Sequence, residues 1–132
     1  TFHYEIDENL NELINKIKSN NIKVGIAIKP KTPWAEIKKY LHTIDQVIIM
    51  TVEPGFGGQL FMNDQVKKIK ALSNYINENN LVVDIEVDGG VNYETGELCI
   101  KAGANVLVAG SFLFQQDNLK IATNNLNDFF NK

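Results

Sequence analysis

Short runs of β-branched residues alternate with helix-spaced segments along all 132 residues, and few folds accommodate such an order. The strand-like runs occupy residues 1–4, 22–28, 46–51, 82–87 and 105–109. After each run, apolar residues recur every three or four positions, which is typical of amphipathic helices. A β-α order repeated five times, at a spacing of roughly 23 to 37 residues, predicts parallel strands joined by right-handed crossovers. Either a doubly wound open sheet or a (β/α)8 barrel satisfies this order.

The polarity of residues 83–88 distinguishes these two architectures. Asp84, Glu86 and Asp88 alternate with Val or Ile, so one face of this strand is acidic and the other is apolar. A central strand of an open parallel sheet would be apolar on both faces. The interior of a barrel tolerates polar side chains near its catalytic mouth. We therefore predict an α/β fold of the TIM (β/α)8 barrel type.

The length of the chain limits how much of a barrel it can supply. A complete barrel typically needs about 250 residues, and five β-α units cannot close eight strands. The chain also opens at Thr1, apparently within a strand. We expect residues 1–132 to be the C-terminal part of a single barrel domain, with three units upstream, and we find no linker or second domain.

Several residues predict where helices begin and end. Asp7 is a plausible N-cap for the first helix, and Thr32 followed by Pro33 predicts the start of the second. Asn92 predicts the start of a helix that ends at Gly103.

Three glycine-containing loops follow predicted strands. Residues 50–61 read Met-Thr-Val-Glu-Pro-Gly-Phe-Gly-Gly-Gln-Leu-Phe, residues 87–90 read Val-Asp-Gly-Gly, and residues 108–111 read Val-Ala-Gly-Ser. Glycine lets backbone N–H groups approach an anion closely, and a following helix adds its positive end. If the three loops converge, they would hold a phosphorylated metabolite.

Asp88 is the strongest candidate for chemistry. It ends a strand directly before two glycines and shares a face with Glu86, so it should reach the mouth of the barrel beside a bound phosphate ester. A carboxylate there can bind a metal ion, transfer a proton or cap the next helix.

Composition excludes some classes of partner. A formal net charge of −3 without a dense basic run gives no reason to expect nucleic acid or an anionic membrane as partner. No apolar run approaches the roughly 20 residues needed to cross a bilayer, so we expect a cytoplasmic protein. Cys99 lies in an apolar helical pattern and is expected to be a small core residue rather than a nucleophile.

Five groups of residues together resemble one enzyme family. They are Phe2, His3 and Glu5; Ala-Ile-Lys-Pro at 27–30 with Thr32 and Pro33; the glycine-rich sequence from Met50 with Phe61; Glu-Val-Asp-Gly-Gly at 86–90; and Val-Ala-Gly-Ser at 108–111. Over nearly its whole length the chain closely resembles the ribulose-phosphate 3-epimerases. These barrel enzymes of the pentose phosphate pathway interconvert D-ribulose 5-phosphate and D-xylulose 5-phosphate.

The resemblance implies roles for ten residues. In the family, two aspartates move the C3 proton and one divalent cation, Zn, Fe, Mn or Co, stabilises the enediolate. Asp88 resembles the second aspartate, which is both a catalytic group and a metal ligand. The implied substrate and phosphate contacts are Met50, Gly55, Phe56, Gly57, Gly58, Gly89, Gly90, Gly110 and Ser111. Met50 would either cover the enediolate with a polarizable surface or pack in the barrel interior.

The resemblance also shows what the chain lacks. In the family the first aspartate and two metal-binding histidines come from the second and third strands, which lie outside this chain. We therefore expect half a metal site, and no epimerase activity from residues 1–132 alone. His3 is expected to make a structural hydrogen bond and His42 to be solvated, while Glu53, Glu86 and Lys29 are candidates for orienting neighbours.

Two other functions fit the same residues. One is an allulose-phosphate 3-epimerase, and the other is a non-catalytic phosphate-binding barrel fragment. Asp88 argues against the second, because anion binding gains nothing from a nearby carboxylate. Family members are often dimeric or higher, so the resemblance implies a homo-oligomer with a sugar phosphate as its substrate.

Overall fold

Five parallel strands form one sheet in the computed structural model, which describes all 132 residues. The strands are β1 (Phe2–His3), β2 (Gly25–Ile28), β3 (Gln46–Met50), β4 (Asp84–Asp88) and β5 (Val106–Val108), and they lie in this order. Each strand pairs in parallel with the next one along the chain. The sheet is open between β1 and β5. The chain is thus a partial (β/α)8 barrel, as predicted.

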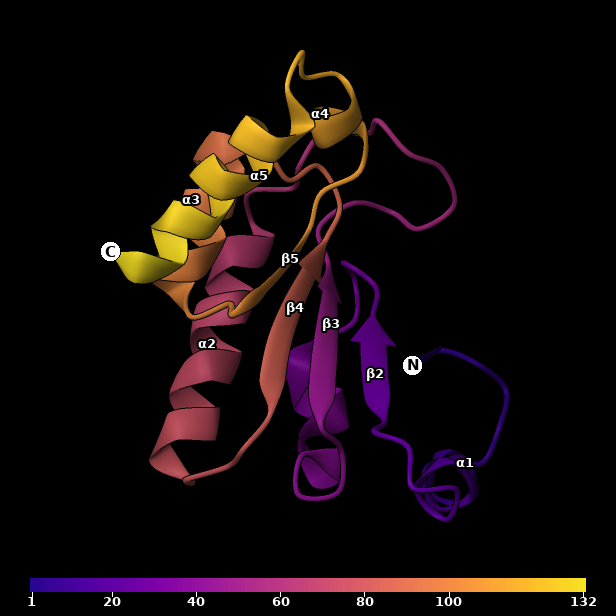
Figure 1. The fold of residues 1–132 in the computed structure, drawn as a ribbon. Coiled ribbons are helices and arrows are strands. Elements are labelled where there is room, and N and C mark those ends of the chain that lie inside the picture. The colour runs from indigo at the N-terminus through magenta and orange to yellow at the C-terminus, as the bar shows by residue number, and fades with distance from the viewer.

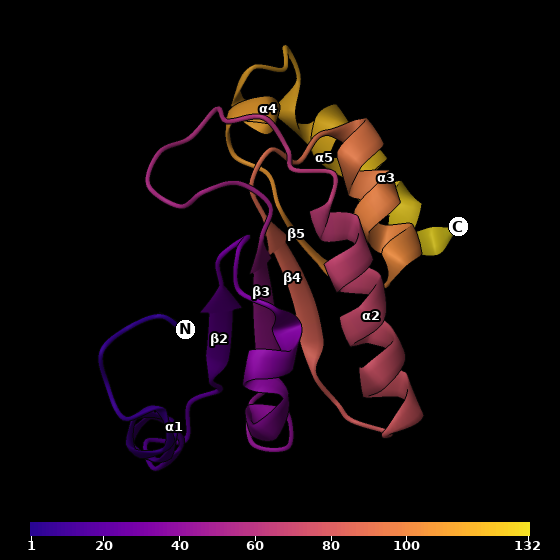
Figure 2. The ribbon, with the colours of Figure 1, turned by 180° about the vertical axis from the view of Figure 1, so that it is seen from behind.

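Helices connect the strands and cover one side of the sheet. They are α1 (Leu10–Lys18), α2 (Gln65–Glu78), α3 (Tyr93–Ala102), α4 (Ser111–Phe114) and α5 (Leu119–Asp128), with the 3-10 helices η1 (Trp34–Tyr40) and η2 (Phe129–Asn131). Figures 1 and 2 show α2, α3 and α5 side by side along the sheet. No helix is long and apolar enough to cross a membrane.

The two faces of the sheet differ in composition, as the alternation in residues 83–88 predicted. On the outer face, Ile26, Val47, Ile49, Ile85 and Val87 are buried in a core of 21 residues that includes the inner sides of the helices. Burying apolar surface of this kind contributes roughly 25 cal/mol per Å². This face therefore supplies most of the stability of the fold.

The inner face carries a smaller apolar cluster and two acidic side chains. Ala27, Ile48 and Met50 form the cluster. The register of β3 and β4 sets Glu86 beside Ile48, and Asp88 beside Met50. An apolar residue of β3 thus lies beside each carboxylate on the side facing the barrel interior.

Two predicted helix starts differ from the structure, and one short helix was not predicted. Asn9, not Asp7, is the N-cap of α1, and its side chain accepts a hydrogen bond from the Glu12 N–H. The segment after Pro33 is a 3-10 helix without a side-chain cap, because the Thr32 hydroxyl donates to Glu5 instead. The helix α4 did not appear in the sequence pattern, since four residues show no period.

The boundaries of α3 are confirmed. Asn92 and Thr95 form a reciprocal capping box at its start. Gly103 ends it at a φ of 117°, a backbone conformation that residues with a Cβ rarely adopt.

Candidate active site

A cavity of about 960 Å³ lies at the carboxyl ends of the strands. The loops after β3, β4 and β5 meet at this end of the sheet (Figure 1). All ten residues singled out from the sequence line the cavity: Met50, Gly55, Phe56, Gly57, Gly58, Asp88, Gly89, Gly90, Gly110 and Ser111. The expected convergence of the three loops is therefore observed, while the roles of these residues stay predictions.

Asp88 ends β4 on the inner face of the sheet and is half-buried. Its carboxylate accepts no hydrogen bond from another residue of the chain, and burial raises its pKa above the usual value. A desolvated carboxylate without a protein partner can take up a cation or a proton. Asp88 thus offers the cavity a carboxylate that has no partner within the chain.

Glu86 lies two residues earlier on the same face. Its Oε2 accepts a 2.6 Å hydrogen bond from Gln46 Nε2 on β3. Burial raises the pKa of Glu86, and the nearby charge of Asp88 raises it further. Gln46 thus holds Glu86 across the strand pair, and Glu86 has a partner that Asp88 lacks.

The loop that contains the first glycine cluster is held at its base and open at its tip. The Met62 N–H donates to the Thr51 carbonyl at 2.8 Å, which closes the base. Gln59 Nε2 donates to the carbonyls of Glu53 and Phe56, which shapes the middle. The side chain of Phe56 is 76% exposed, and a Cβ added at Gly55 or Gly58 would meet nothing within 4 Å.

Met50 is buried at the end of β3, beside Ala27 and Ile48. It also lines the cavity next to Asp88. Both expected roles, packing in the interior and covering a bound molecule, are therefore compatible with its position.

Gly89 and Gly90 lie where neighbouring residues leave no room for a side chain, which the sequence did not reveal. A Cβ at Gly89 would lie 2.5 Å from Cγ2 of Val52, and one at Gly90 would lie 2.7 Å from the backbone nitrogen of Phe61. Both glycines also have positive φ angles, 130° and 66°. The loop after β4 thus packs directly against both ends of the loop after β3.

The loop after β5 completes this side of the cavity. A Cβ at Gly57 would lie 3.3 Å from Oγ of Ser111, so the first and third glycine loops approach each other. Ser111 begins the short helix α4.

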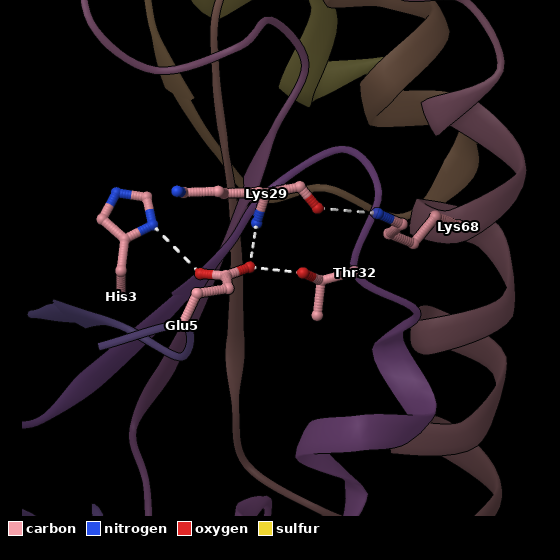
Figure 3. A network of polar contacts seen from close by, with 5 residues as sticks. All are labelled: His3, Glu5, Lys29, Thr32 and Lys68. Atoms are coloured by element: carbon pink, nitrogen blue, oxygen red, sulfur yellow. Dashed lines mark hydrogen bonds and ion pairs between the residues drawn. The ribbon is translucent and has the colours of Figure 1, made fainter. Parts of the chain in front are cut away.

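A network of polar side chains holds the other side of the mouth, after β1 and β2 (Figure 3). Oε1 of Glu5 accepts hydrogen bonds from the Lys29 N–H at 2.8 Å and from the Thr32 hydroxyl at 2.5 Å. Nδ1 of His3 lies 3.5 Å from Oε2 of Glu5. Lys68, from α2, donates to the carbonyls of Lys29 and Pro30.

The electrostatics of this network favour an ionised Glu5. Burial alone would raise the pKa of Glu5, but the hydrogen bonds from Thr32 and the Lys29 N–H lower it below the usual value. Burial lowers the pKa of Lys68, while Asp64 and Glu5 partly restore it. His42, by contrast, is exposed on the outside of the barrel, as expected.

The chain alone does not contain a complete metal site. No three His, Cys, Asp or Glu side chains lie together in an arrangement that could hold a metal ion. Asp88 fits one ligand position, since its carboxylate faces the cavity and has no partner in the chain. Cys99 is fully buried, and burial raises its pKa to about 12, so it is a core residue as expected.

These features define a class: a parallel β/α layer whose site lies at the carboxyl ends of its strands, as in the (β/α)8 barrels. The family model described as "Ribulose-phosphate 3 epimerase family" matches residues 1–114. The chain belongs to this family, and the resemblance found in its sequence is confirmed.

Individual relatives agree with this assignment. The chain is 45% identical over 128 residues, 97% of its length, to the ribulose-phosphate 3-epimerase of Methanocaldococcus jannaschii. It is 43% identical over 121 residues, 91% of its length, to that of Bacillus subtilis. These matches cover 55% and 56% of the two relatives, so the chain spans about half the length of the curated relatives it matches.

Proposed function

We propose that the protein containing this chain is a ribulose-phosphate 3-epimerase, which interconverts D-ribulose 5-phosphate and D-xylulose 5-phosphate in the pentose phosphate pathway. One observation carries the proposal most directly. The unpartnered carboxylate of Asp88 lines the same cavity as three glycine-containing loops. Family membership and the names of the relatives support the same reaction.

The reaction requires proton transfer on both faces of C3. The hydrogen at C3 is acidic because the neighbouring C2 ketone accepts the electrons as an enediolate. In our proposal, Asp88 exchanges a proton with C3 on one face, and an acidic residue outside this chain does so on the other. A positioned acid or base of this kind contributes roughly 10² to 10⁴ to the rate.

A single divalent cation, Zn, Fe, Mn or Co, is the proposed cofactor. Asp88 would supply one of its ligands, and the others would come from residues outside this chain. When bound, such an ion would polarise substrate oxygens and favour the ionised form of its carboxylate ligand. The glycine loops of this chain would hold the substrate beside the ion.

The glycine loops are the proposed phosphate site. The backbone near Gly57, Gly90 and Ser111 lines one side of the cavity. Amides that are not used within the fold can donate to a phosphate at close range because glycine adds no side chain. Holding the phosphate there fixes the distance between the sugar carbons and Asp88, which is the main contribution that binding makes to catalysis.

The test is an Asp88→Asn substitution in the whole protein, with Asp7→Asn as the matched control. Asp7 is exposed and makes no side-chain hydrogen bond. We expect turnover of D-ribulose 5-phosphate to fall at least about 10²-fold in the first variant and to be unchanged in the second. Calorimetry should show weaker divalent-metal binding for Asp88→Asn only. Activity and metal affinity that both survive would refute the proposal.

Two further measurements address the alternatives. Faster turnover of D-allulose 6-phosphate than of D-ribulose 5-phosphate would favour an allulose-phosphate epimerase. Phosphate binding without turnover of either sugar would favour a non-catalytic module. Residues 1–132 alone are proposed to be inactive, because they carry one metal ligand.

We also propose a cytoplasmic homo-oligomer that takes a sugar phosphate and binds neither nucleic acid nor membranes. A relative named as a cytoplasmic isoform, from Oryza sativa, is 41% identical over 118 residues and supports the compartment. Cell fractionation tests the location, and light scattering after size-exclusion chromatography tests the oligomer.

A further inference from the structure

Two buried threonine hydroxyls lie behind the glycines of the loop after β4. Thr51 Oγ1 donates to the Gly89 carbonyl at 2.5 Å. Thr95 Oγ1 donates to the Gly90 carbonyl at 3.0 Å. The two threonines come from different elements, since Thr51 follows β3 and Thr95 lies in the first turn of α3. They thus hold two successive carbonyls of one short loop.

Both hydroxyls are enclosed by protein. Thr51 is 0% exposed and Thr95 is 8% exposed. The Thr51 N–H also donates to the Asp88 carbonyl at 3.0 Å, and Thr95 Oγ1 accepts from the Asn92 N–H at 2.9 Å. The Gly90 carbonyl is the nearer of two acceptors for the Thr95 hydroxyl, since Asn92 Oδ1 lies at 3.2 Å. These contacts hold both threonine oxygens in place, because losing a partner leaves a buried polar group unsatisfied.

Fixing a carbonyl also fixes the amide that follows it. In a trans peptide, the C=O of one residue and the N–H of the next point in opposite directions, and the chain has no cis peptide. Because the Gly89 carbonyl points at Thr51, the Gly90 N–H points away from it. In the same way, the Val91 N–H points away from Thr95.

The amides of Gly90 and Val91, which are oriented in this way, have no hydrogen-bond acceptor within the chain. The N–H groups of Gly90 and Val91 donate no hydrogen bond within the chain, whereas the Asn92 N–H donates to Thr95. Both residues line the cavity. The positive φ angles of Gly89 and Gly90 give this turn its shape, and successive N–H groups in such turns form concavities that bind anions.

We propose that Thr51 and Thr95 are positioning residues that aim the amides of Gly90 and Val91 at the substrate phosphate. The inference rests on the proposed function, because it assigns a structural cause to the phosphate site of that reaction. Neither hydroxyl touches the substrate. Each acts through the peptide group whose carbonyl it holds.

The first experiment uses the whole protein and four variants. Thr51→Val and Thr95→Val remove one hydroxyl each at nearly constant volume, and Thr51→Ser retains it. Thr123→Val is the control, since the Thr123 hydroxyl donates to the Leu119 carbonyl on α5, away from the cavity. Calorimetry measures the affinity for inorganic phosphate, and steady-state assays with D-ribulose 5-phosphate give KM and kcat.

We expect Thr51→Val and Thr95→Val each to bind phosphate about fivefold to tenfold more weakly than the wild type, which is the effect of losing one well-placed hydrogen bond. KM should rise by a similar factor while kcat changes less than about threefold, since the phosphate is bound equally in the ground and transition states. Thr51→Ser should restore phosphate affinity to within about twofold. Thr123→Val should match the wild type in both affinity and KM.

A second measurement does not depend on the variants folding. In the wild-type protein, titration with phosphate should shift the amide resonances of Gly90 and Val91 more than those of Asn92 and Thr95. The inference is overturned if these two amides do not shift, or if the Val variants fold and keep wild-type phosphate affinity. It is also overturned if the wild-type protein binds no phosphate.

The outcomes separate this inference from the proposed function. A wild-type protein that binds phosphate through Gly90 and Val91 but does not turn over the sugar refutes the epimerase proposal and supports the role of the threonines. An active wild-type enzyme whose Thr51→Val and Thr95→Val variants keep KM and phosphate affinity supports the epimerase proposal and refutes this role.

Discussion

The two sides of the cavity mouth are built by different means. On the side of β1 and β2, charged side chains hold the loop. Glu5 binds the backbone of Lys29 and the hydroxyl of Thr32, and Lys68 binds the Lys29 carbonyl (Figure 3). Lys68 also binds the Pro30 carbonyl. On the side of β3 and β4, two loops touch through glycines and threonine hydroxyls. No charged side chain takes part in those contacts.

The difference predicts how each side tolerates change. A flexible charged side chain can be replaced at a modest cost, because water or another group can serve the exposed polar atoms. A Cβ cannot be added at these glycines without moving the backbone, because protein interiors are close-packed. The side with the glycines should therefore be the more sensitive to substitution, and the charged side the more sensitive to pH.

Gly90→Ala should have the largest effect and test the first half of this comparison. The new Cβ would meet the backbone of Phe61 at 2.7 Å, and the φ of 66° disfavours it further. We expect the whole protein to lose about 1–3 kcal/mol of stability. The displaced loop should also cost about 10²-fold in kcat/KM, since misplacement of about 1 Å can have that effect.

Gly103→Ala is the matched control for that prediction. Gly103 also has a positive φ, 117°, and a Cβ there would meet the side chain of Ser73, far from the mouth. Urea unfolding should show a similar loss of stability, but kcat/KM of the folded protein should stay at the wild-type value. Equal activity in both variants would mean that the contact between Gly90 and Phe61 has no bearing on the site.

Much of this fold could be predicted because its signals are local. The alternation of strands and helices, the acidic face of residues 84–88 and the capping box at Asn92 each depend on residues close in sequence. The missed helix start at Thr32 depends on a distant partner, whereas the one at Asn9 is a local choice between two possible caps. Thr32 does not cap the next helix because its hydroxyl donates a hydrogen bond to Glu5, 27 residues earlier.

In the candidate site, too, contacts between residues distant in sequence could not be predicted. The resemblance to the family supplied its ten residues, and their convergence could be expected because loops at the carboxyl ends of parallel strands meet at one edge of the sheet. For Gly89 and Gly90, the sequence suggested one reason for the missing side chain, the close approach of an anion to the backbone. Their contacts with Val52 and Phe61 join segments about 30 to 40 positions apart, and no local pattern encodes such a contact.

Lys68→Met should have an intermediate effect on the charged side. The substitution keeps the apolar stem but removes hydrogen bonds to the carbonyls of Lys29 and Pro30. We expect a loss of about 1–2 kcal/mol in the free energy of unfolding of the whole protein. Lys67→Met is the control, since Lys67 is exposed and makes no such bond. If both variants unfold at the same urea concentration, Lys68 does not hold the loop.

Glu5→Gln should have the smallest effect at neutral pH and the clearest dependence on pH. The pKa of Glu5 is lowered in the folded protein, so its carboxylate adds stability at pH values above the unfolded pKa of about 4.3. That contribution is lost as the pH falls through the folded pKa. His3, Lys29 and Lys68 are the titratable neighbours of Glu5.

We therefore expect Glu5→Gln to cost about 1 kcal/mol at pH 7, because a neutral amide is a weaker acceptor than a carboxylate for the Lys29 N–H and the Thr32 hydroxyl. The difference from wild type should shrink below about pH 4, as the wild-type carboxylate takes up its proton. Glu8→Gln, at an exposed position without side-chain hydrogen bonds, should show no difference at either pH. Urea unfolding at pH 7 and pH 3.5 measures both variants. A gap between Glu5→Gln and wild type that persists at the lower pH would show that packing, not the charge of Glu5, holds this side of the mouth.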